Sequence, residues 1–201
     1  FSGTEQIYFD GYTVAINDRN LDNFALGYQH GACGYVIGNL QEDSTFLGTS
    51  GSGALGLNGS QTQHIGIDCK KDGISLRYNI GQSNITGSQG SIITNGRAMV
   101  DTWMIGYNTK NWQFEVGQPL AVRQGDLNLN VASSIDTDGT HNYTDYKVDM
   151  DINNRHTVSK IGYNNNLTSN VNFSFNVEYN NNYANTDKDS WSLATGVKYD
   201  F

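Results

Sequence analysis

The last stretch of the chain, Trp191–Phe201, alternates strictly between two kinds of side chain. Every second residue from Trp191 is apolar or threonine, and small or charged residues lie between them. A helix would scatter these positions around its axis, so a period of two predicts a β-strand. Its length is about that of a membrane-crossing strand, roughly 9–11 residues. The apolar face then packs either on the core of a soluble protein or against lipid, with the other face lining a barrel lumen.

Composition excludes some classes of protein but does not decide between a soluble β-fold and a membrane barrel. The chain has 201 residues and a single proline, while glycine is abundant at 23 residues, and no amphipathic helical stretch stands out. The net charge of -8 argues against a nucleic-acid partner, because nucleic acids select basic surfaces. The sequence contains no run of 18 apolar residues, so it predicts no transmembrane helix. No signal peptide opens the sequence, so we expect Phe1 to begin a processed or excised fragment.

Alternating segments recur along the chain, with turn residues between them. The strictest examples are Ile74–Ile80 and Val171–Tyr179. Together these signals predict about 12 strands. Their polar positions carry Asn, Ser, Gln, Asp and Lys, which suit a wet lumen as well as a solvated face. We therefore expect an all-β fold, an antiparallel up-and-down β-barrel over residues 22–201, with 1–21 as a linker or extra N-terminal strand. A β-sandwich is the alternative.

Four local signals predict turns, loops or interruptions. Asn58-Gly59 is the strongest hairpin signal in the chain. The sequence predicts a long polar loop over residues 81–97 and a turn at residues 123–126. Pro119 lies late in an alternating segment, which suits an edge, an end or a bulge, because proline cannot donate to a ladder.

The two cysteines, Cys33 and Cys69, leave two interpretations open. A disulfide is usual in an exported protein, whereas both residues also fit as small unpaired apolar side chains. Counting strands between them places Cys33 and Cys69 at opposite rims of the barrel. Because a disulfide requires Cα atoms within ~7 Å, we expect both to be unpaired.

The barrel interpretation assigns faces to the last two alternating segments. The polar face would place Asn172, Ser174, Glu178 and Lys198 in the lumen. The opposite face would contact lipid, and its residues are Phe173, Phe175, Val177, Leu193, Val197, Tyr199 and Phe201.

One acidic segment resembles a calcium-binding loop of the EF-hand type. Asp136, Asp138 and Asp145 supply oxygen ligands at suitable spacing, and Gly139 lies where the sharp turn belongs. The flanking helices and the bidentate glutamate are missing, so an acidic solvated loop is favoured over calcium. We expect no other cofactor.

No catalytic arrangement is convincing. His30, Ser50 and Asp136 occur in segments reminiscent of subtilisins, but in the wrong order and without helices. The four histidines do not stand at zinc-ligand spacing from the cysteines. We therefore expect a chain without enzymatic activity.

Two longer blocks give the chain a family resemblance. Phe24–Ile80 contains FALGYQHGACGYVIGNL, FLGTSGSGALGL and HIGIDCKKDGISLRYNI, and WQFEVGQPLAV follows at Trp112–Val122. With the terminal strand, this order resembles the C-terminal region of bacterial subtilisin-like serine-protease autotransporters. A terminal aromatic such as Phe201 also resembles the end of outer-membrane barrels, where it is part of what the assembly machinery recognises.

The resemblance implies a non-catalytic translocator or anchor domain in the bacterial outer membrane, downstream of a secreted protease. Its implied partners are outer-membrane lipid, the barrel assembly machinery and an N-terminal passenger. The alternative is a secreted or cell-surface structural β-sandwich, which would self-assemble into homo-oligomers through exposed strand edges.

Overall fold

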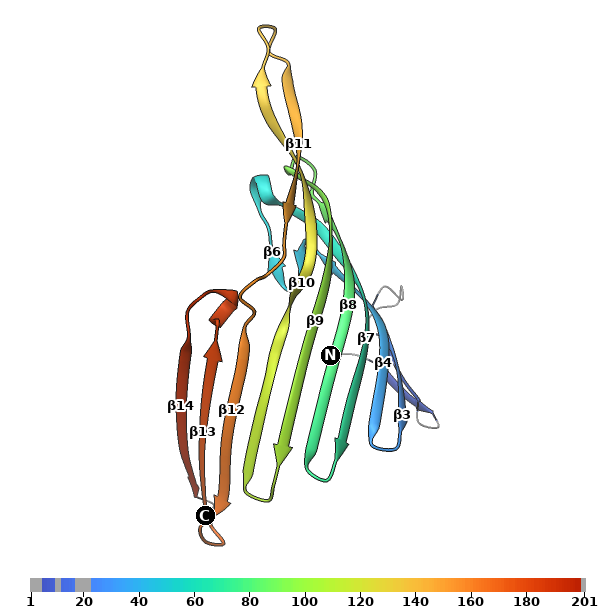
Figure 1. Ribbon diagram of the computed structural model, residues 1–201. Coiled ribbons are helices and arrows are strands. Elements are labelled where there is room, and N and C mark those ends of the chain that lie inside the picture. The colour runs from blue at the N-terminus through green and yellow to red at the C-terminus, as the bar shows by residue number, and fades with distance from the viewer. Residues whose placement is uncertain (1–4, 10–11, 17–22, 200–201) are drawn as a thin grey trace.

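A computed structural model of the chain describes the backbone of residues 5–9 and 12–16 and all of residues 23–199. The fold is all-β, with one twelve-stranded antiparallel sheet and a separate two-stranded sheet (Figure 1). The strands of the large sheet are β1 (Glu5–Phe9), β2 (Tyr12–Ile16), β3 (Phe24–His30), β4 (Cys33–Asp43), β7 (Leu57–Lys71), β8 (Ile74–Gly87), β9 (Ile93–Asn108), β10 (Trp112–Ile135), β11 (His141–Asp149), β12 (Thr157–Asn166), β13 (Val171–Asn181) and β14 (Ser190–Tyr199). The small sheet contains β5 (Thr45–Phe46) and β6 (Thr49–Ser50), and the 3-10 turns are η1 (Gly53–Leu55) and η2 (Tyr183–Asn185).

The large sheet is an up-and-down meander in which most neighbours in space are also neighbours along the chain. Its order is β1-β2-β3-β4-β7-β8-β9-β10-β12-β13-β14, with β11 beside β10. Short turns join strands at one end, at residues 31–32, 72–73, 109–111 and 167–170. Longer connections lie at the other end, so the two ends of the sheet differ in kind (Figure 1).

The central strand β10 is the longest, with 24 residues. Its first part, Trp112–Gly117, pairs with β12. Its last part, from Asp126, pairs with β11 instead, and this β10–β11 hairpin projects beyond the sheet (Figure 1). Pro119 lies at a register shift between Gln118 and Ala121, which agrees with the bulge, one of the three predicted possibilities.

Three predicted interruptions are wrong because strands continue through them. The expected turn at 123–126 lies within β10, where a second register shift absorbs it. Most of the expected loop at 81–97 belongs to β8 and β9. Gly59 lies within β7 opposite Asp43, where a Cβ would stand 2.4 Å from the carbonyl oxygen of Glu42. Glycine therefore permits a close approach of two strands there, not a turn.

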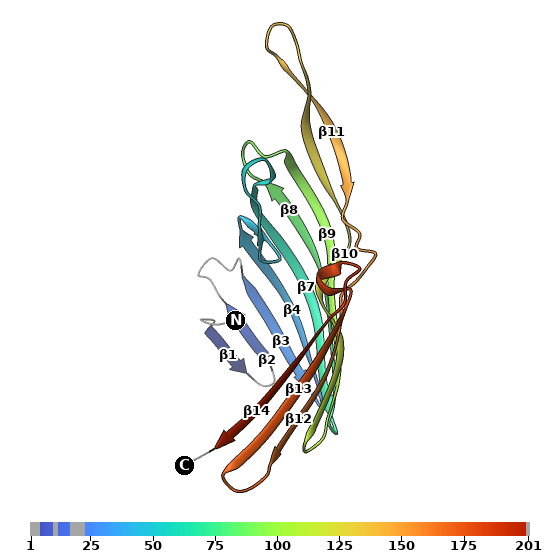
Figure 2. The ribbon, with the colours of Figure 1, turned by 90° about the vertical axis from the view of Figure 1, so that its left-hand side faces the viewer.

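The sheet is a single curved layer. Figure 2 shows that its two edge strands, β1 and β14, bend to the same side of the middle strands. Within the described residues β1 and β14 are not paired with each other. No second large sheet packs on this one there either, so the described residues do not form the alternative β-sandwich. The terminal strand itself is confirmed as β14.

The only cluster of fully buried apolar side chains in the described residues is small. It contains Ile85, Ala98 and Val100, which lie toward the end with the long connections. A fold of this size with so little buried apolar surface is unusual for a water-soluble domain, whose stability rests on such burial.

Candidate membrane-facing surface

One face of the large sheet is apolar across nearly its whole width. Cross-strand partners in an antiparallel sheet point to the same face. One row of partners crosses six strands and consists of Ile74, Tyr107, Phe114, Ile161, Val177 and Leu193. A second row consists of Tyr28, Tyr35, Ile67, Tyr78 and Trp103. Period-two alternation on each strand thus becomes a continuous apolar belt on the sheet.

The belt is exposed, and no other layer covers it within the described residues. Trp191 is 74% exposed, Val197 71% and Leu193 58%. Isolated apolar side chains are normal on a protein surface, but a contiguous patch marks a surface that meets something apolar. The other exposed members of the belt are Leu26, Tyr28, Tyr35, Ile37, Ile65, Ile74, Leu76, Ile105, Tyr107, Trp112, Phe114, Val116, Ile161 and Tyr179.

The structure places the described members of the predicted lipid-facing set on this belt. Phe173 pairs with Val197, and Val177 with Leu193. Phe175 shares their face opposite Thr195, while Tyr199 ends β14 at 54% exposure. Phe201 lies outside the described residues. The described members therefore form one surface, and their contact with lipid stays a prediction.

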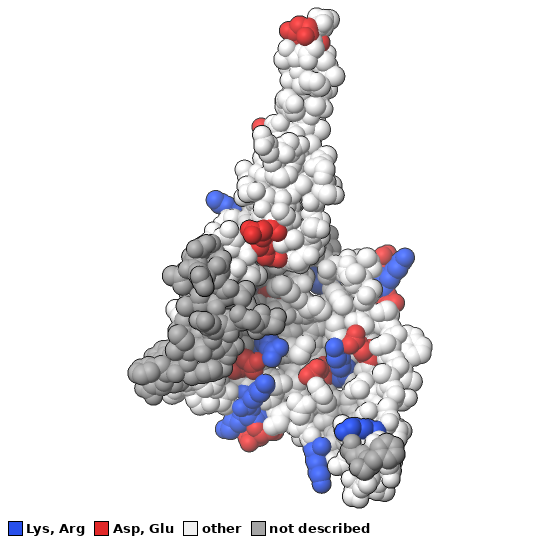
Figure 3. Space-filling model, turned by 180° about the vertical axis from the view of Figure 1, so that it is seen from behind, with Lys and Arg blue, Asp and Glu red and all other residues white. Residues whose placement is uncertain are grey.

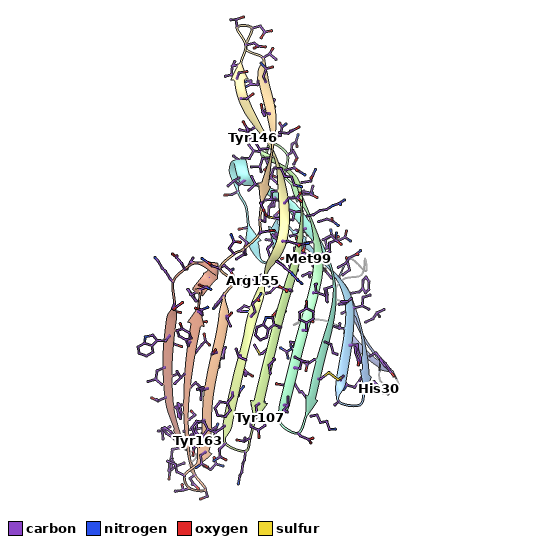
Figure 4. The ribbon with its side chains drawn as sticks, in the orientation of Figure 1. His30, Met99, Tyr107, Tyr146, Arg155 and Tyr163 are labelled. Carbon is purple, nitrogen blue, oxygen red and sulfur yellow. A yellow bond between two sulfur atoms is a disulfide. The ribbon has the colours of Figure 1, made fainter. Side chains whose placement is uncertain are left out.

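Aromatic rings gather at both ends of the belt. Near the short turns, the ring centroid of Trp112 lies 4.7 Å from that of Tyr163 and 5.8 Å from that of Phe175 (Figure 4, where Tyr163 is labelled). At the other end Tyr179 is the partner of Trp191. Trp191 and Tyr199 are separated by eight residues, which is about 27 Å along a strand. A membrane-crossing barrel has an apolar band about 25 Å tall between two aromatic girdles.

The opposite face of the sheet is polar and concave. An ion pair of 2.9 Å joins Arg77 to Asp68, and another of 2.9 Å joins Lys160 to Glu178. Figure 3 views this face, with charges of both signs spread over it, and Figure 2 shows that the sheet edges bend toward it. The residues predicted to face a lumen alternate with the belt residues on β13 and β14, so they lie on this face: Asn172, Ser174, Glu178 and Lys198.

A polar cluster ends the belt in the middle of the sheet. Asp101 is the partner of Ile80 but is only 4% exposed, because Arg155 from the connection between β11 and β12 forms an ion pair with it. The side chain of Gln118 donates to Asp101 at 3.4 Å and accepts from the indole N–H of Trp103 at 3.3 Å. Arg155 lies where the projecting hairpin returns to the sheet (Figure 4). No sequence pattern marked this cluster, since its members are distant in the chain.

The predicted calcium ligands occupy different parts of the projecting hairpin. Asp138 accepts the backbone N–H of Thr140 at 2.9 Å, which lowers the pKa of that carboxyl. Asp136 accepts from Asn142 at 2.9 Å, and Asp145 accepts from Asn130 at 2.7 Å within the β10–β11 ladder. No group of three or more His, Cys, Asp or Glu side chains is arranged to hold a metal in the described residues. The calcium prediction therefore has no assembled ligand set to support it.

The residues reminiscent of a protease lie on separate elements. His30 ends β3, Ser50 ends β6, and Asp136 begins the tip of the projecting hairpin. They do not supply the hydrogen-bonded geometry by which a catalytic triad is recognised.

The prediction that the cysteines are unpaired is wrong. Cys33 and Cys69 form a disulfide. Residues 44–56 hold only the short β5–β6 hairpin and η1, so no further sheet strand separates β4 from β7. The start of β4 therefore lies beside the end of β7, at the same rim.

Comparison with known protein families finds no matching family, and comparison with curated proteins finds no match. Among the described residues, no helix is long and apolar enough to cross a membrane.

Proposed function

We propose that this chain is an outer-membrane β-barrel domain of the translocator or anchor kind, without catalytic activity. The observation that carries the proposal is the exposed apolar belt on one face of a single curved sheet whose other face holds ion pairs. In water such a belt is unfavourable, because apolar surface is driven out of water. In a bilayer the same belt meets acyl chains, and the β-ladder satisfies the backbone groups as lipid demands.

The two ends of the sheet differ in the length of their connections, and this difference supports one orientation of the barrel in the membrane. Membrane barrels have short turns on the periplasmic side and longer loops outside. The short turns, such as 72–73, would then face the periplasm, and the projecting β10–β11 hairpin would stand outside the cell. The C-terminal end of β14 would lie at the periplasmic rim, where the barrel assembly machinery would meet this strand.

Strand direction constrains how the sheet would close into a barrel. The path from β1 to β14 consists of antiparallel pairings throughout and holds eleven strands, so its first and last strands run the same way. They cannot form an antiparallel pair with each other. Closure would need either direct parallel pairing of β1 with β14 or a strand between them that runs the opposite way.

The family resemblance supports the translocator part of the proposal. The blocks at Phe24–Ile80 and Trp112–Val122 supply β3–β4, β7–β8 and the lower part of β10, which are elements of the belt. An autotransporter-like domain would hold an N-terminal passenger at the polar lumen, and its location would be the bacterial outer membrane.

The test compares two adjacent positions of β14 in reconstituted protein. Leu193 lies on the belt and Ala194 on the concave face. Leu193→Cys and Ala194→Cys variants are labelled with an environment-sensitive dye and placed in bilayers containing brominated lipid. We expect bromine to quench the dye at position 193 several-fold more than at position 194. Folded protein should also migrate differently on a gel before and after heating. Equal quenching at both positions, or solubility without detergent, would contradict the proposal.

One observation favours a second candidate, self-assembly through sheet edges. β14 is the last strand of the sheet, and from Trp191 on its residues are exposed. Long exposed edge strands pair with other chains unless they are protected. A homo-oligomer of this kind would be polymeric without detergent, and its size by light scattering would rise with protein concentration.

A further inference from the structure

The connection between β4 and β7, residues 44–56, crosses the concave face of the sheet. In Figure 1 its cyan trace emerges on the far side of β8 and β9, and Figure 2 places it on the concave side of β9 and β10. The connection holds the β5–β6 hairpin and η1. It therefore lies on the polar face, at the end with the long connections.

Apolar packing fixes this connection to the sheet. Phe46 and Leu47 pack, with Leu57 at the start of β7, on the cluster of Ile85, Ala98 and Val100. Nearby on the same face Ser83 is 0% exposed, and its hydroxyl lies 2.7 Å from that of Thr62. The connection therefore covers part of this cluster, and Val122, Leu127 and Met150 also pack on it.

A single carboxylate organises the near end of the connection. Glu42, next to last in β4, accepts the backbone N–H groups of Leu47 at 2.9 Å and Gly48 at 2.8 Å. It also accepts the hydroxyls of Thr45 at 3.4 Å and Ser60 at 3.2 Å. Hydrogen bonds to a charged acceptor are about twice as strong as neutral ones. Glu42 therefore holds the β5–β6 hairpin in its folded-back position.

The far end of the connection is tied to the β8–β9 connection. The carbonyl of Ala54 accepts the backbone N–H of Ile92 at 2.8 Å and the hydroxyl of Ser91 at 3.1 Å. The carbonyl of Gly56 accepts the backbone N–H of Ser88 at 3.0 Å. Because both ends are anchored, the connection is a fixed element of the concave face.

We infer that residues 44–56 form a fixed constriction of the lumen, which narrows the passage to small hydrophilic solutes. The inference rests on the proposed function, because the concave face is a lumen only in a barrel. The segment contains no charged residue, and its polar groups are hydroxyls and backbone amides. Such a lining gives weak discrimination between anions and cations, since strong selectivity in pores comes from rings of charge.

The experiment measures conductance of single proteins in planar bilayers. Residues 45–55 are replaced by Gly-Ser-Gly, which removes the hairpin and leaves β4 and β7 intact. We expect the conductance of this variant to be at least two-fold higher than that of the native chain. Glu115→Gln is the matched control, because this carboxylate lies on the concave face far from the constriction, and we expect unchanged conductance. Equal conductance of native and shortened chains would overturn the inference.

A labelling experiment separates this inference from the proposed function. In detergent, Ser83→Cys should react with a maleimide at least ten-fold more slowly than Asn176→Cys, an exposed position on the concave face. Adding Glu42→Gln should raise the rate at position 83 and leave position 176 unchanged. Fast labelling at position 83 in the native background would overturn the constriction whether or not the protein inserts. Absence of insertion together with slow labelling would overturn the barrel, and with it the role of this segment in a lumen.

Discussion

Cys33 and Cys69 are direct cross-strand partners, with Cα atoms 3.9 Å apart and a bond between their sulfurs. The backbone N–H of Lys70 donates to the carbonyl of Ala32 at 2.7 Å, which makes the pair a non-hydrogen-bonded one, where strands approach most closely. The disulfide joins two strands at the rim with the short turns.

Removing the disulfide should lower stability. The two cysteines are 36 residues apart, so the chain-entropy model gives a loss of about 3–4 kcal/mol on removal of the crosslink. The measurement is the free energy of unfolding in urea for native protein and the Cys33→Ala/Cys69→Ala double variant. Reductant should also add the mass of two hydrogens to the native chain. An unchanged mass would contradict the disulfide.

Breaking the ion pair between Asp101 and Arg155 should be costly. Asp101→Asn leaves the guanidinium without its charge partner, and we expect a loss of about 2–4 kcal/mol in the free energy of unfolding. Asp68→Asn is the matched control, because the Asp68–Arg77 pair is exposed, and its loss should be under about 1 kcal/mol. A double-mutant cycle with Arg155→Met measures the coupling. Equal losses at the two sites would show that burial of Asp101 is unimportant.

A charge placed on the belt should destabilise the protein only if the belt meets lipid. Phe175→Arg near the middle of the membrane should cost roughly 2–4 kcal/mol in a bilayer. Asn176→Arg, one residue later, places the same charge on the concave face and should cost under about 1 kcal/mol. The measurement is folding from urea into lipid vesicles. If both variants fold equally well, the belt does not face lipid.

The connection between β13 and β14 should loosen in acid. Asp189 accepts the hydroxyl of Tyr179 at 2.7 Å and the backbone N–H of Asn182 at 3.1 Å, and these bonds lower the pKa of its carboxyl from the usual 3.8. A lowered folded-state pKa gives stabilisation that is present above the unfolded pKa and is lost as pH falls through the folded pKa. Hydrogen-exchange protection of the Asn182 amide, corrected for intrinsic rate, should therefore fall in that range. In Asp189→Ala it should be low at every pH.

Deleting Phe201 should reduce the amount of folded protein in the membrane. In the barrel interpretation the terminal aromatic is part of what the assembly machinery recognises, so its loss should affect insertion far more than stability. In a soluble protein a terminal residue contributes under about 0.5 kcal/mol. The measurement is heat-modifiable protein in membrane fractions for chains ending at Asp200 and at Phe201. Unchanged insertion would remove the terminal signal from the proposal.

The sequence was sufficient for most strands, and for which side chains share a face, because both are local properties. Alternation with period two in Val171–Tyr179 and Trp191–Phe201 specifies which side chains share a face, and the ladder of β13 with β14 preserves it. The bulge at Pro119 also follows from one residue, because proline removes a donor from any ladder.

The wrong predictions come mainly from miscounting the strands that lie between two positions in the chain. Residues 44–56 add no strand to the large sheet, because they form the connection over the concave face, so Cys69 lies at the same rim as Cys33 and not at the opposite one. The pair Asn58-Gly59 is typical of a tight turn. Glycine also allows two strands to approach closely, and that is the role of Gly59 in this fold. The Asp101–Arg155 pair depends on a connection that crosses from β11 to β12, and local pattern carries no information about such a crossing.

The length of β10 has a mechanical consequence. Its upper part forms the projecting hairpin, while its lower part is hydrogen-bonded to β9 on one side and β12 on the other. A pull on the hairpin tip, directed away from the sheet, would act along the axis of β10. Ladder bonds loaded along the strand direction share the force and must break together, unlike bonds opened one at a time from an end. A pull on the hairpin tip along β10 would therefore load the ladder bonds of β10 with β9 and β12 together.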